Sequence, residues 1–464
     1  MCGVLGVSGV PEAARVAYSG LYALQHRGQE SAGIVSVDPD GRAHSHLGMG
    51  LVSEVFSDAV LDNLPGDIAI GHTRYSTAGS TVLANAQPRL VNYRNVPLSL
   101  SHNGNLTNAA EIKDDLVDQG ALFMSSSDSE VLVHLIARSV ARDPAQQIRG
   151  ALEQVEGAYS LVIGIGRTLY AAVDSRGFRP LFLARLGSGL IVASETCAFD
   201  LLGATVIREL EPGDFVRITD GQLEELPPLG SRPRSRCVFE LVYFSRPDSQ
   251  IFGHSVDRVR RELGRHLARE HPADDAEVVF SVPDSANAMA LGFSEVSGIK
   301  LEHGLIRNHY IGRTFIQPSQ AHRVAKVRIK FNPVREVIDG KSVAVVDDSL
   351  VRGTTSKGLV QMIRAAGARK VHLRLASPPI IGPCHYGIDT PNPEELIATT
   401  RSLDDIRAHL GVDSLAYLSL EGMLSAAGGE NGYCHACFSN QYPTHIPDNP
   451  IQLRQIPPLI PTHA

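Results

Sequence analysis

The spacing of apolar residues along the first half of the chain predicts short strands interrupted by a few helices. Apolar or alternating runs bounded by Gly, Asn and Pro are typical of strands that end in turns. Val131, Leu132, Leu135 and Ile136 recur at helical spacing and predict a helix over residues 128–141. We expect two packed sheets with flanking helices over residues 1–228. The clearest strands are residues 68–72, 98–102, 160–164 and 190–194.

The pattern changes after the proline-rich residues 226–233, which we interpret as a domain linker. An apolar face formed by Val256, Val259, Leu263 and Leu267 predicts a helix. Apolar runs then alternate with helical stretches, which favours a mostly parallel α/β sheet. The tail from Asn440 is rich in proline and polar residues and is expected to be irregular. The apolar runs are residues 277–282, 342–347 and 371–375.

Length, charge and hydropathy narrow the class of protein. A chain of 464 residues is too long to fold around one ordinary hydrophobic core, so two domains are expected. The formal net charge of −7 argues against a nucleic-acid-binding protein. The sequence has no apolar run of eighteen or more residues, so we expect no membrane span. Residues 1–7 have no basic leader and no apolar stretch of signal-peptide length, so a cytoplasmic protein is the default expectation.

Cys2 directly follows the initiator methionine, and its small side chain favours removal of Met1. The mature chain would then carry a thiol and a free α-amine on one residue. An α-amine has a pKa near 8 in model peptides, low enough for it to act as a base towards the thiol. Cys2 is therefore a candidate nucleophile, although a Met-Cys start alone is a weak signal.

Three stretches of polar residues strengthen the case for Cys2. They are residues 26–33 (HRGQESAG), 71–79 (GHTRYSTAG) and 101–106 (SHNGNL). An oxyanion hole needs donors aimed at the developing negative charge, and the Asn103 amide with the Gly104 N–H supplies two. A free amino-acid substrate needs a cation for its carboxylate and an acid for its ammonium group. Arg74 and Asp128 are suitable in type.

Each of these residues also has a purely structural interpretation. Asn103-Gly104 is typical of a type I′ turn between strands. Arg74 is compatible with a surface ion pair, and Asp128 with the N-cap of the predicted helix. Each structural interpretation, taken alone, is more probable than the functional one. The occurrence of all these residues together favours the functional interpretation.

Cys2 and the three polar stretches, at these intervals, resemble the N-terminal-nucleophile glutaminase domain of the class II amidotransferases. The resemblance covers about residues 2–225 and implies an α+β fold built as an αββα sandwich, with a domain at residues 2–228. It implies Cys2 as the nucleophile and Asn103 with Gly104 as the oxyanion hole. The substrate-binding residues that it implies are Arg27, Arg74 and Asp128.

A second motif lies where the apolar strand at residues 342–347 ends. Asp347 and Asp348 are followed by a Ser/Gly/Thr loop and a predicted helix at residues 356–366. Such a loop at a helix N-terminus offers N–H groups and hydroxyls to phosphate. Carboxylates at the carboxyl end of a strand in an open α/β sheet are placed to hold ligand hydroxyls. The spacing does not fit a Walker loop. The alternative is a turn that carries these residues for capping.

The stretch resembles the PRPP (phosphoribosyl pyrophosphate) motif of type I phosphoribosyltransferases. The resemblance implies an α/β phosphoribosyltransferase domain at residues 236–464, including a C-terminal extension. Residues 282–286 resemble the pyrophosphate-side loop of that family, which implies Mg²⁺ near Ser285, Asp347 and Asp348. The substrate-binding residues implied here are Asp347, Asp348, Ser349, Arg352, Gly353, Thr354 and Thr355.

Residues 307–318 are neither clean helix nor clean strand, and their Gly, aromatic and polar content suits a loop that closes over substrate. An exposed connector is the alternative. The stretch is similar to the flexible catalytic loop of glutamine PRPP amidotransferases, which implies Arg313 as a substrate-binding residue. Arg328 and Lys330 are expected to belong to the same anionic site.

Four of the six cysteines lie in the second half, and two of them form a Cys-x-x-Cys. Four thiolates suit a structural zinc or an iron–sulfur cluster, and spacing alone leaves both open. Four unrelated buried thiols are the third alternative. One branch of the amidophosphoribosyltransferase family carries a [4Fe–4S] cluster at matching positions, which implies a cluster here. The residues are Cys237, Cys384, Cys434 and Cys437.

Taken together, the two halves resemble the amidophosphoribosyltransferase family, iron–sulfur type. The resemblance implies an enzyme that takes ammonia from glutamine and uses it to replace the pyrophosphate of PRPP, in the first committed step of purine synthesis. It also implies a homotetramer with feedback by purine nucleotides. Another glutamine-dependent synthase is disfavoured by Asp347-Asp348. A regulatory protein that senses PRPP without turnover is disfavoured by intact Cys2, Asn103 and Arg313.

Overall fold

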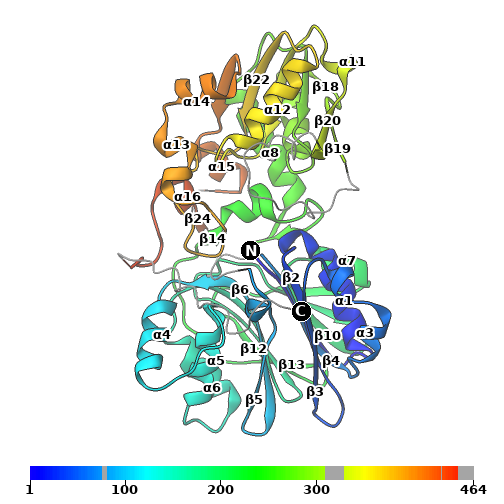
Figure 1. Cartoon of the computed structure of the whole chain (residues 1–464), viewed down its shortest axis with the longest axis vertical. Coiled ribbons are helices and arrows are strands. Elements are labelled where there is room, and N and C mark those ends of the chain that lie inside the picture. The colour runs from blue at the N-terminus through cyan, green and yellow to red at the C-terminus, as the bar shows by residue number, and fades with distance from the viewer. Residues whose placement is uncertain (76–80, 309–328, 430, 448–464) are drawn as a thin grey trace, which may run out of the picture. The chain divides into compact units, whose positions relative to one another are not determined.

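The computed structural model describes residues 1–75, 81–308, 329–429 and 431–447 (Figure 1). The described residues fall into two compact units. Unit 1 contains the chain up to Cys237 together with residues 384–389 and the described residues from Tyr442. Unit 2 contains residues 238–383 and 390–441. Two short segments from the second half of the sequence therefore belong to the first unit.

Unit 1 is built on two antiparallel sheets. The seven-stranded sheet has the order β11-β9-β10-β1-β4-β2-β3, and the six-stranded sheet has the order β13-β12-β8-β7-β6-β5. The strands are β1 (Gly3–Ser8), β2 (Ser31–Val37), β3 (Ala43–Met49), β4 (Ile68–Arg74), β5 (Arg89–Tyr93), β6 (Val96–Leu106), β7 (Gly157–Ile165), β8 (Thr168–Val173), β9 (Phe182–Leu186), β10 (Gly189–Ala193), β11 (Thr205–Glu209), β12 (Phe215–Thr219) and β13 (Gln222–Glu225).

The two sheets pack face to face, and helices cover their outer faces. Val4 and Ile70 of the first sheet share a buried core with Val162 and Leu169 of the second. The outer face of the second sheet packs on α5 and α6, and α1 and α7 lie on the first sheet (Figure 1). The αββα sandwich predicted from the sequence is confirmed. The helices are α1 (Ala13–Ala23), α2 (Val52–Val55), α3 (Asp58–Asp62), α4 (Ala109–Asp118), α5 (Ser129–Arg138), α6 (Pro144–Leu152) and α7 (Cys197–Leu202).

The predicted strands and helix of unit 1 correspond to β4, β6, β7, β10 and α5. Strands β4, β6 and β7 run two to six residues longer than the most apolar segments, because hydrogen bonding to neighbours continues into their polar ends, whereas β10 has the predicted length and begins one residue earlier. Strand β4, for example, continues from the predicted apolar run to Arg74 and is buried along its whole length.

His72 makes the stability of unit 1 sensitive to acid. Its side chain in β4 is fully buried, and Nε2–H donates to the His102 carbonyl at 3.1 Å, while Nδ1 has no hydrogen-bond partner among the described residues. Burial and the nearby Arg74 charge lower the pKa of His72 from 6.5 to about 3. Because the folded chain resists protonation that the unfolded chain accepts, stability is lost as the pH falls below 6.5. We expect a loss of about 2 kcal/mol between pH 7 and pH 5 from this residue.

Urea unfolding of wild type and His72→Gln at pH 7 and pH 5 measures this contribution. Glutamine can retain the donor to His102 without titrating, so the variant should lose about 2 kcal/mol less than wild type over this interval. His46→Gln, at a partly exposed position on strand β3 of the same sheet, serves as the matched control. An equal pH dependence for wild type and His72→Gln would contradict the assignment.

Unit 2 is organised around a parallel sheet of five strands in the order β18-β17-β21-β22-β23. This confirms the predicted α/β sheet, and the apolar runs correspond to β17, β21 and β22. The strands of the sheet and its helices are β17 (Val278–Ser281), β18 (Lys300–Leu301), β21 (Ser342–Asp347), β22 (Lys370–Leu375), β23 (Ser414–Tyr417), α8 (Val256–Glu270), α9 (Asn287–Ser297), α12 (Thr354–Ala365), α14 (Leu403–Leu410) and α15 (Leu420–Ala426).

Shorter elements complete the description of the fold. A small hairpin is formed by β19 (Leu305–Arg307) and β20 (Phe331–Pro333). Other short elements are the hairpin of β15 (Gln250–Ile251) and β16 (His254–Ser255), together with β14 (Arg236–Cys237), α11 (Arg335–Ile338), α13 (Ile397–Thr400), β24 (Tyr433–Cys434) and α16 (Ala436–Ser439). No helix within the described ranges combines the length and the apolar composition that a membrane crossing requires.

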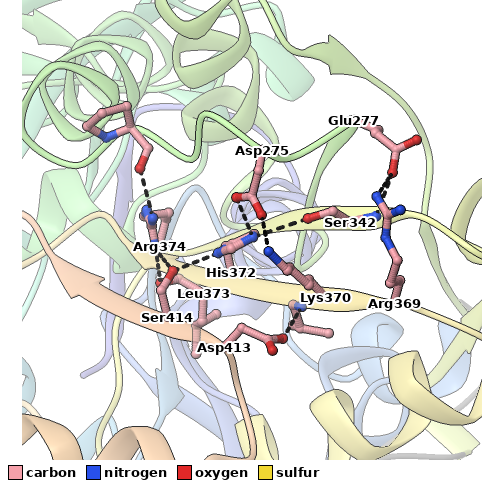
Figure 2. Close-up of polar contacts among 12 residues, drawn as sticks. Asp275, Glu277, Ser342, Arg369, Lys370, His372, Leu373, Arg374, Asp413 and Ser414 are labelled. Carbon is pink, nitrogen blue, oxygen red and sulfur yellow. Dashed lines mark hydrogen bonds and ion pairs between the residues drawn. The ribbon is translucent and has the colours of Figure 1, made fainter.

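A polar network covers one face of the sheet in unit 2 (Figure 2). His372 Nδ1 lies 2.8 Å from Ser414 Oγ, and Nε2 lies 3.0 Å from Asp275 Oδ1 and 3.2 Å from Ser342 Oγ. Arg374 donates to the backbone carbonyls of residues 271 and 272. Burial lowers the pKa of both His372 and Arg374. These contacts fix residues 271–277 against the sheet and explain the polar positions inside an otherwise apolar strand.

Candidate active sites

Cys2 is buried just before β1, with 8% of its surface exposed. In the chain that retains Met1, the Cys2 N–H donates to Asn103 Oδ1 at 3.1 Å, and Sγ lies 3.7 Å from the Tyr75 carbonyl oxygen. The side chain of Asn103 therefore contacts the nitrogen that becomes the α-amine once Met1 is removed. Two residues separated by a hundred positions are brought together, as the sequence predicted.

Asn103 and Gly104 lie inside strand β6, paired with Ser160 and Tyr159 of β7. The alternative of a hairpin turn is therefore wrong. Asn103 is fully buried, and its Nδ2 has no hydrogen-bond partner among the described residues. A buried hydrogen-bond donor without an acceptor costs free energy in a folded protein, and a bound ligand can supply the missing acceptor. The Nδ2 of Asn103 is thus available to an oxyanion.

Gly104 has a backbone conformation that excludes other residues. Its φ is +152°, and a Cβ atom at this position would lie 2.0 Å from the carbonyl oxygen of Ala158. Glycine is therefore required both by the local conformation and by the close approach of β7.

Arg27 is fully buried and contacts the backbone of Cys2. Its Nε donates to the Cys2 carbonyl at 3.0 Å, and NH1 binds Glu195. His26 Nε2 lies 2.7 Å from the same Glu195 oxygen. Sequence reasoning missed Glu195, although it follows the apolar strand β10 as the acid pair follows β21. An acid at the end of a buried strand is the signal by which Glu195 could have been found.

Arg74 ends strand β4 and is 3% exposed, so the alternative of a surface ion pair is wrong. Its NH1 lies 3.7 Å from Glu30 Oε2. The backbone of Arg74 also passes close to Gly28, where a Cβ atom would lie 2.6 Å from the Arg74 nitrogen. The first and second polar stretches of the sequence are therefore in direct contact.

Asp128 occupies the N-cap position of α5, but its side chain makes no capping hydrogen bond. Instead, Oδ2 accepts the Leu106 N–H at 3.0 Å and lies 3.6 Å from His102 Nδ1. Asp128 is 6% exposed. Its carboxylate contacts β6 at His102 and at Leu106, on either side of the Asn103-Gly104 pair. The contact joins Asp128 to the third polar stretch and disfavours a capping role.

In unit 2, Asp347 and Asp348 lie at the carboxyl end of β21 and are 9% and 5% exposed. Ser285 Oγ donates to Asp348 Oδ2 at 2.5 Å, and Ser349 Oγ donates to Asp348 Oδ1 at 2.6 Å. The Asp348 N–H donates to Asp347 Oδ1 at 2.9 Å. The structure thus brings the pyrophosphate-side loop and the acid pair together, as the sequence predicted.

The charged forms of Asp347 and Asp348 are disfavoured in the folded chain. Burial, followed by the neighbouring Asp348 charge, raises the pKa of Asp347 well above its usual value. Burial also raises the pKa of Asp348, against the opposing effect of the hydrogen bonds from Ser285 and Ser349. Two adjacent carboxylates that are removed from water favour the binding of a cation, which offsets their mutual repulsion. Carboxylate oxygens are ligands that suit a hard divalent ion such as Mg²⁺.

The loop after the acid pair leads into α12, which starts at Thr354 immediately after Gly353. The backbone N–H groups of the first helical turn therefore face the end of β21, where a phosphate would be favoured. Arg352, predicted as a ligand, forms an ion pair with Glu395 at 2.7 Å, and both side chains are about half exposed. A cavity of about 140 Å³ is lined by Ser281, Asp284, Asn287, His303, Gly304 and Arg307, among others.

Several predicted residues cannot be placed. Arg313 and Arg328 lie outside the described residues, as do most of the predicted substrate loop and residues 76–79 of the second polar stretch. Lys330 is described, and its charge opposes the raised pKa of Asp347.

The four predicted metal-ligating cysteines form no disulfide among the described residues. Cys237 ends β14, Cys384 belongs to the segment of unit 1 at residues 384–389, Cys434 ends β24 and Cys437 lies in α16. In the part of the chain that the structure describes, no group of three or more His, Cys, Asp or Glu side chains is arranged to hold a metal ion.

The sandwich fold and the environment of Cys2 define unit 1 as a glutamine amidotransferase domain. A sequence model of that domain, described as "Glutamine amidotransferase domain", matches residues 72–200. This match includes the end of β4 with Arg74, the Asn103-Gly104 strand and Asp128.

The whole chain is similar to a group of curated enzymes. It is 50% identical over 445 residues to the chloroplastic amidophosphoribosyltransferase 2 of Arabidopsis thaliana, covering 95% of this chain and 79% of that protein. It is 48% identical over 451 residues to the amidophosphoribosyltransferase of Bacillus subtilis, covering 96% and 94%. A solved structure of glutamine PRPP amidotransferase from Bacillus subtilis, in complex with ADP and GMP, matches with a TM-score of 0.90 and 47% identity over 97% and 98% of the two chains. The chain belongs to the amidophosphoribosyltransferase family.

Proposed function

We propose that this enzyme converts glutamine and PRPP to 5-phosphoribosylamine, glutamate and pyrophosphate, in the first committed step of purine synthesis. One observation carries the proposal. The chain contains two different sites. In unit 1, the buried Cys2 lies beside Asn103, whose amide Nδ2 has no hydrogen-bond partner among the described residues. In unit 2, the buried Asp347 and Asp348 lie at the end of a strand. The first suits amide cleavage and the second suits a sugar phosphate.

In unit 1, Cys2 acts as the nucleophile after Met1 has been removed. The free α-amine accepts the thiol proton, and the thiolate attacks the amide carbon of glutamine. Asn103 Nδ2 and the Gly104 N–H stabilise the negative oxygen of the tetrahedral intermediate. The amine returns its proton to the leaving nitrogen, ammonia departs, and water hydrolyses the thioester to glutamate.

The remaining buried residues of unit 1 hold the reactants. Arg74 binds the carboxylate of glutamine, and Asp128 binds its ammonium group, each through a charge-assisted hydrogen bond. Arg27 fixes the Cys2 carbonyl, and the fully buried Glu195 fixes Arg27. Such support confines the thiol to a reactive geometry.

In unit 2, ammonia attacks C1 of PRPP as pyrophosphate leaves. Asp347 and Asp348 bind the ribose hydroxyls and stabilise positive charge at C1, and the backbone N–H groups of the loop bind the 5-phosphate. When bound, Mg²⁺ held near Ser285 and the acid pair neutralises charge on the pyrophosphate. Arg313, outside the described residues, stays a predicted substrate ligand. The other loop ligands in this proposal are Ser349, Arg352, Gly353, Thr354 and Thr355.

The test follows glutamate and pyrophosphate together, with and without PRPP and Mg²⁺, on protein purified without oxygen. Coupled release of both products supports the proposal. Glutamate release without PRPP consumption would indicate another glutamine-dependent synthase. If neither product appears from protein whose N-terminal Cys2 is confirmed by mass spectrometry, the regulatory alternative is favoured.

The second part of the proposal is that Cys237, Cys384, Cys434 and Cys437 bind a [4Fe–4S] cluster. It is supported by four cysteines gathered in the second half of the sequence, with one Cys-x-x-Cys among them. The reaction has no redox step, so a cluster would have a structural role. A structural zinc is the alternative for the same ligands.

We expect iron and acid-labile sulfide in equal amounts, together with visible absorbance, in protein purified without oxygen. Cys434→Ser should lose both, and Cys197→Ser, which changes a buried thiol outside this set, should retain them. Stoichiometric zinc without sulfide would establish the alternative, and protein without either metal would refute both.

The quaternary and regulatory parts of the proposal rest on the family. We expect a homotetramer that is inhibited by purine nucleotides, since the related enzyme from Bacillus subtilis was solved with ADP and GMP. We also expect a cytoplasmic location, with which the thiol form of the cysteines agrees. Light scattering and inhibition assays with purine nucleotides test these expectations.

A further inference from the structure

Residues 384–389, here called the return segment, belong to unit 1, although residues on both sides of the segment belong to unit 2. The segment is firmly anchored. Tyr386 is 2% exposed, its ring stacks on Phe178 with a centroid distance of 4.2 Å, and its hydroxyl lies 2.8 Å from Thr444 Oγ1. A stacked and hydrogen-bonded tyrosine in a buried site fixes the backbone that carries it.

Arg179 fixes the same backbone from the other side. Its Nε and NH2 donate to the Tyr386 carbonyl at 3.1 and 2.7 Å, and NH1 lies 2.6 Å from Met1 Sδ. The side chain is 1% exposed. One buried guanidinium therefore contacts both the return segment and the residue bonded to Cys2.

The return segment also contacts the strand that carries the proposed oxyanion hole. Asn105 Nδ2 donates to the His385 carbonyl at 2.9 Å. The backbones of Gly387 and Gly104 are in close contact, because a Cβ atom on Gly387 would lie 2.8 Å from the carbonyl carbon and oxygen of Gly104. Gly387 has a φ of +105°, so glycine is favoured there by conformation as well as by space.

We propose that the return segment positions the Gly104 peptide for oxyanion stabilisation, with Gly387 and Asn105 as positioning residues. This inference rests on the proposed glutaminase reaction of unit 1. An oxyanion donor is effective only within about 2.7–3.1 Å of the developing charge, so a small displacement of the Gly104 peptide lowers the rate. The packing of Gly387 against Gly104 limits such a displacement. A segment that belongs in sequence to the second half thereby supports the chemistry of the first.

Gly387→Ala tests the inference, because its methyl group must displace the Gly104 peptide. We expect kcat for glutamine hydrolysis to fall about 10- to 100-fold, with little change in KM for glutamine, because the lost interaction forms only in the transition state. Ammonia-dependent amination of PRPP should keep its wild-type rate. Gly230→Ala is the matched control, since Gly230 has a similar φ of +113° and a Cβ atom there would meet no atom within 4 Å.

Asn105→Ala provides a test without a steric clash and decides the question should Gly387→Ala fail to fold. Losing the hydrogen bond to the return segment should lower kcat for glutamine several-fold and spare the ammonia-dependent rate. Wild-type kcat in Asn105→Ala, or in a folded Gly387→Ala, would overturn the inference, as would a parallel fall of both activities. Failure of wild type to hydrolyse glutamine would instead refute the proposed function.

Discussion

Cys2→Ala is expected to abolish glutamine-dependent amination of PRPP and to leave ammonia-dependent amination within about twofold of wild type. Removing the nucleophile removes the covalent route to ammonia, and losses of at least about 10³-fold are usual for such changes. The acid pair of unit 2 is untouched by the substitution. Steady-state rates with glutamine and with ammonium chloride, at equal PRPP and Mg²⁺, measure both parts.

The matched control is Cys197→Ala, which makes the same substitution at another buried thiol of unit 1. Cys197 starts helix α7, its Sγ lies 3.8 Å from Glu195 Oε2, and it has no role in the proposed reaction. This variant should keep glutamine-dependent activity. If Cys2→Ala still released glutamate at more than about a hundredth of the wild-type rate, the assignment of the nucleophile would be wrong.

Local patterns in the sequence were sufficient to predict the most apolar of the regular elements. The strand β21 has the predicted bounds, because an uninterrupted apolar run in a parallel sheet is buried on both faces. The same reasoning found Asp347 and Asp348, since two carboxylates after a buried strand have no ordinary structural use. Strand identity and the position of the acid pair are therefore local properties of the sequence.

The Asn103-Gly104 pair shows where local patterns mislead. An Asn-Gly pair is typical of a hairpin turn, yet it lies inside the eleven-residue strand β6. What distinguishes the two interpretations is the neighbouring strand, whose Ala158 carbonyl leaves space only for glycine. Asp128 is similar, because its position is that of an N-cap while its carboxylate binds the Leu106 N–H. In both cases tertiary contacts decide between a structural and a functional role.

The return segment could not be predicted from any local feature. Its contacts with Arg179 and Asn105 join residues more than two hundred positions apart. Neither hydrophobic spacing nor a motif indicates that residues 384–389 belong to unit 1. Glu195 is an intermediate case, because its position after a strand was visible but its partners Arg27 and His26 were not.

Asp347→Asn is expected to eliminate PRPP use and, at the same time, to stabilise unit 2. Amination should fall at least about 100-fold with either nitrogen source, because a neutral amide cannot stabilise positive charge at C1 or help to hold Mg²⁺. This result separates the acid pair from Cys2, whose loss affects glutamine alone. Rates with glutamine and with ammonia, together with calorimetric titration of Mg²⁺ and PRPP, measure the effect.

The gain in stability follows from the raised pKa of Asp347. Burial and Asp348 disfavour the charge of Asp347 in the folded chain, so ionisation of this carboxylate destabilises the fold above its unfolded pKa, and the cost is relieved as the pH falls. Asparagine keeps an oxygen to accept the Asp348 N–H and removes the charge, which should add about 1 kcal/mol without Mg²⁺ or PRPP. Asp404→Asn, at a side chain that is 86% exposed, is the isosteric control and should change neither property. Lower stability of Asp347→Asn, or retained amination with ammonia, would show that the pair serves the fold and not the substrate.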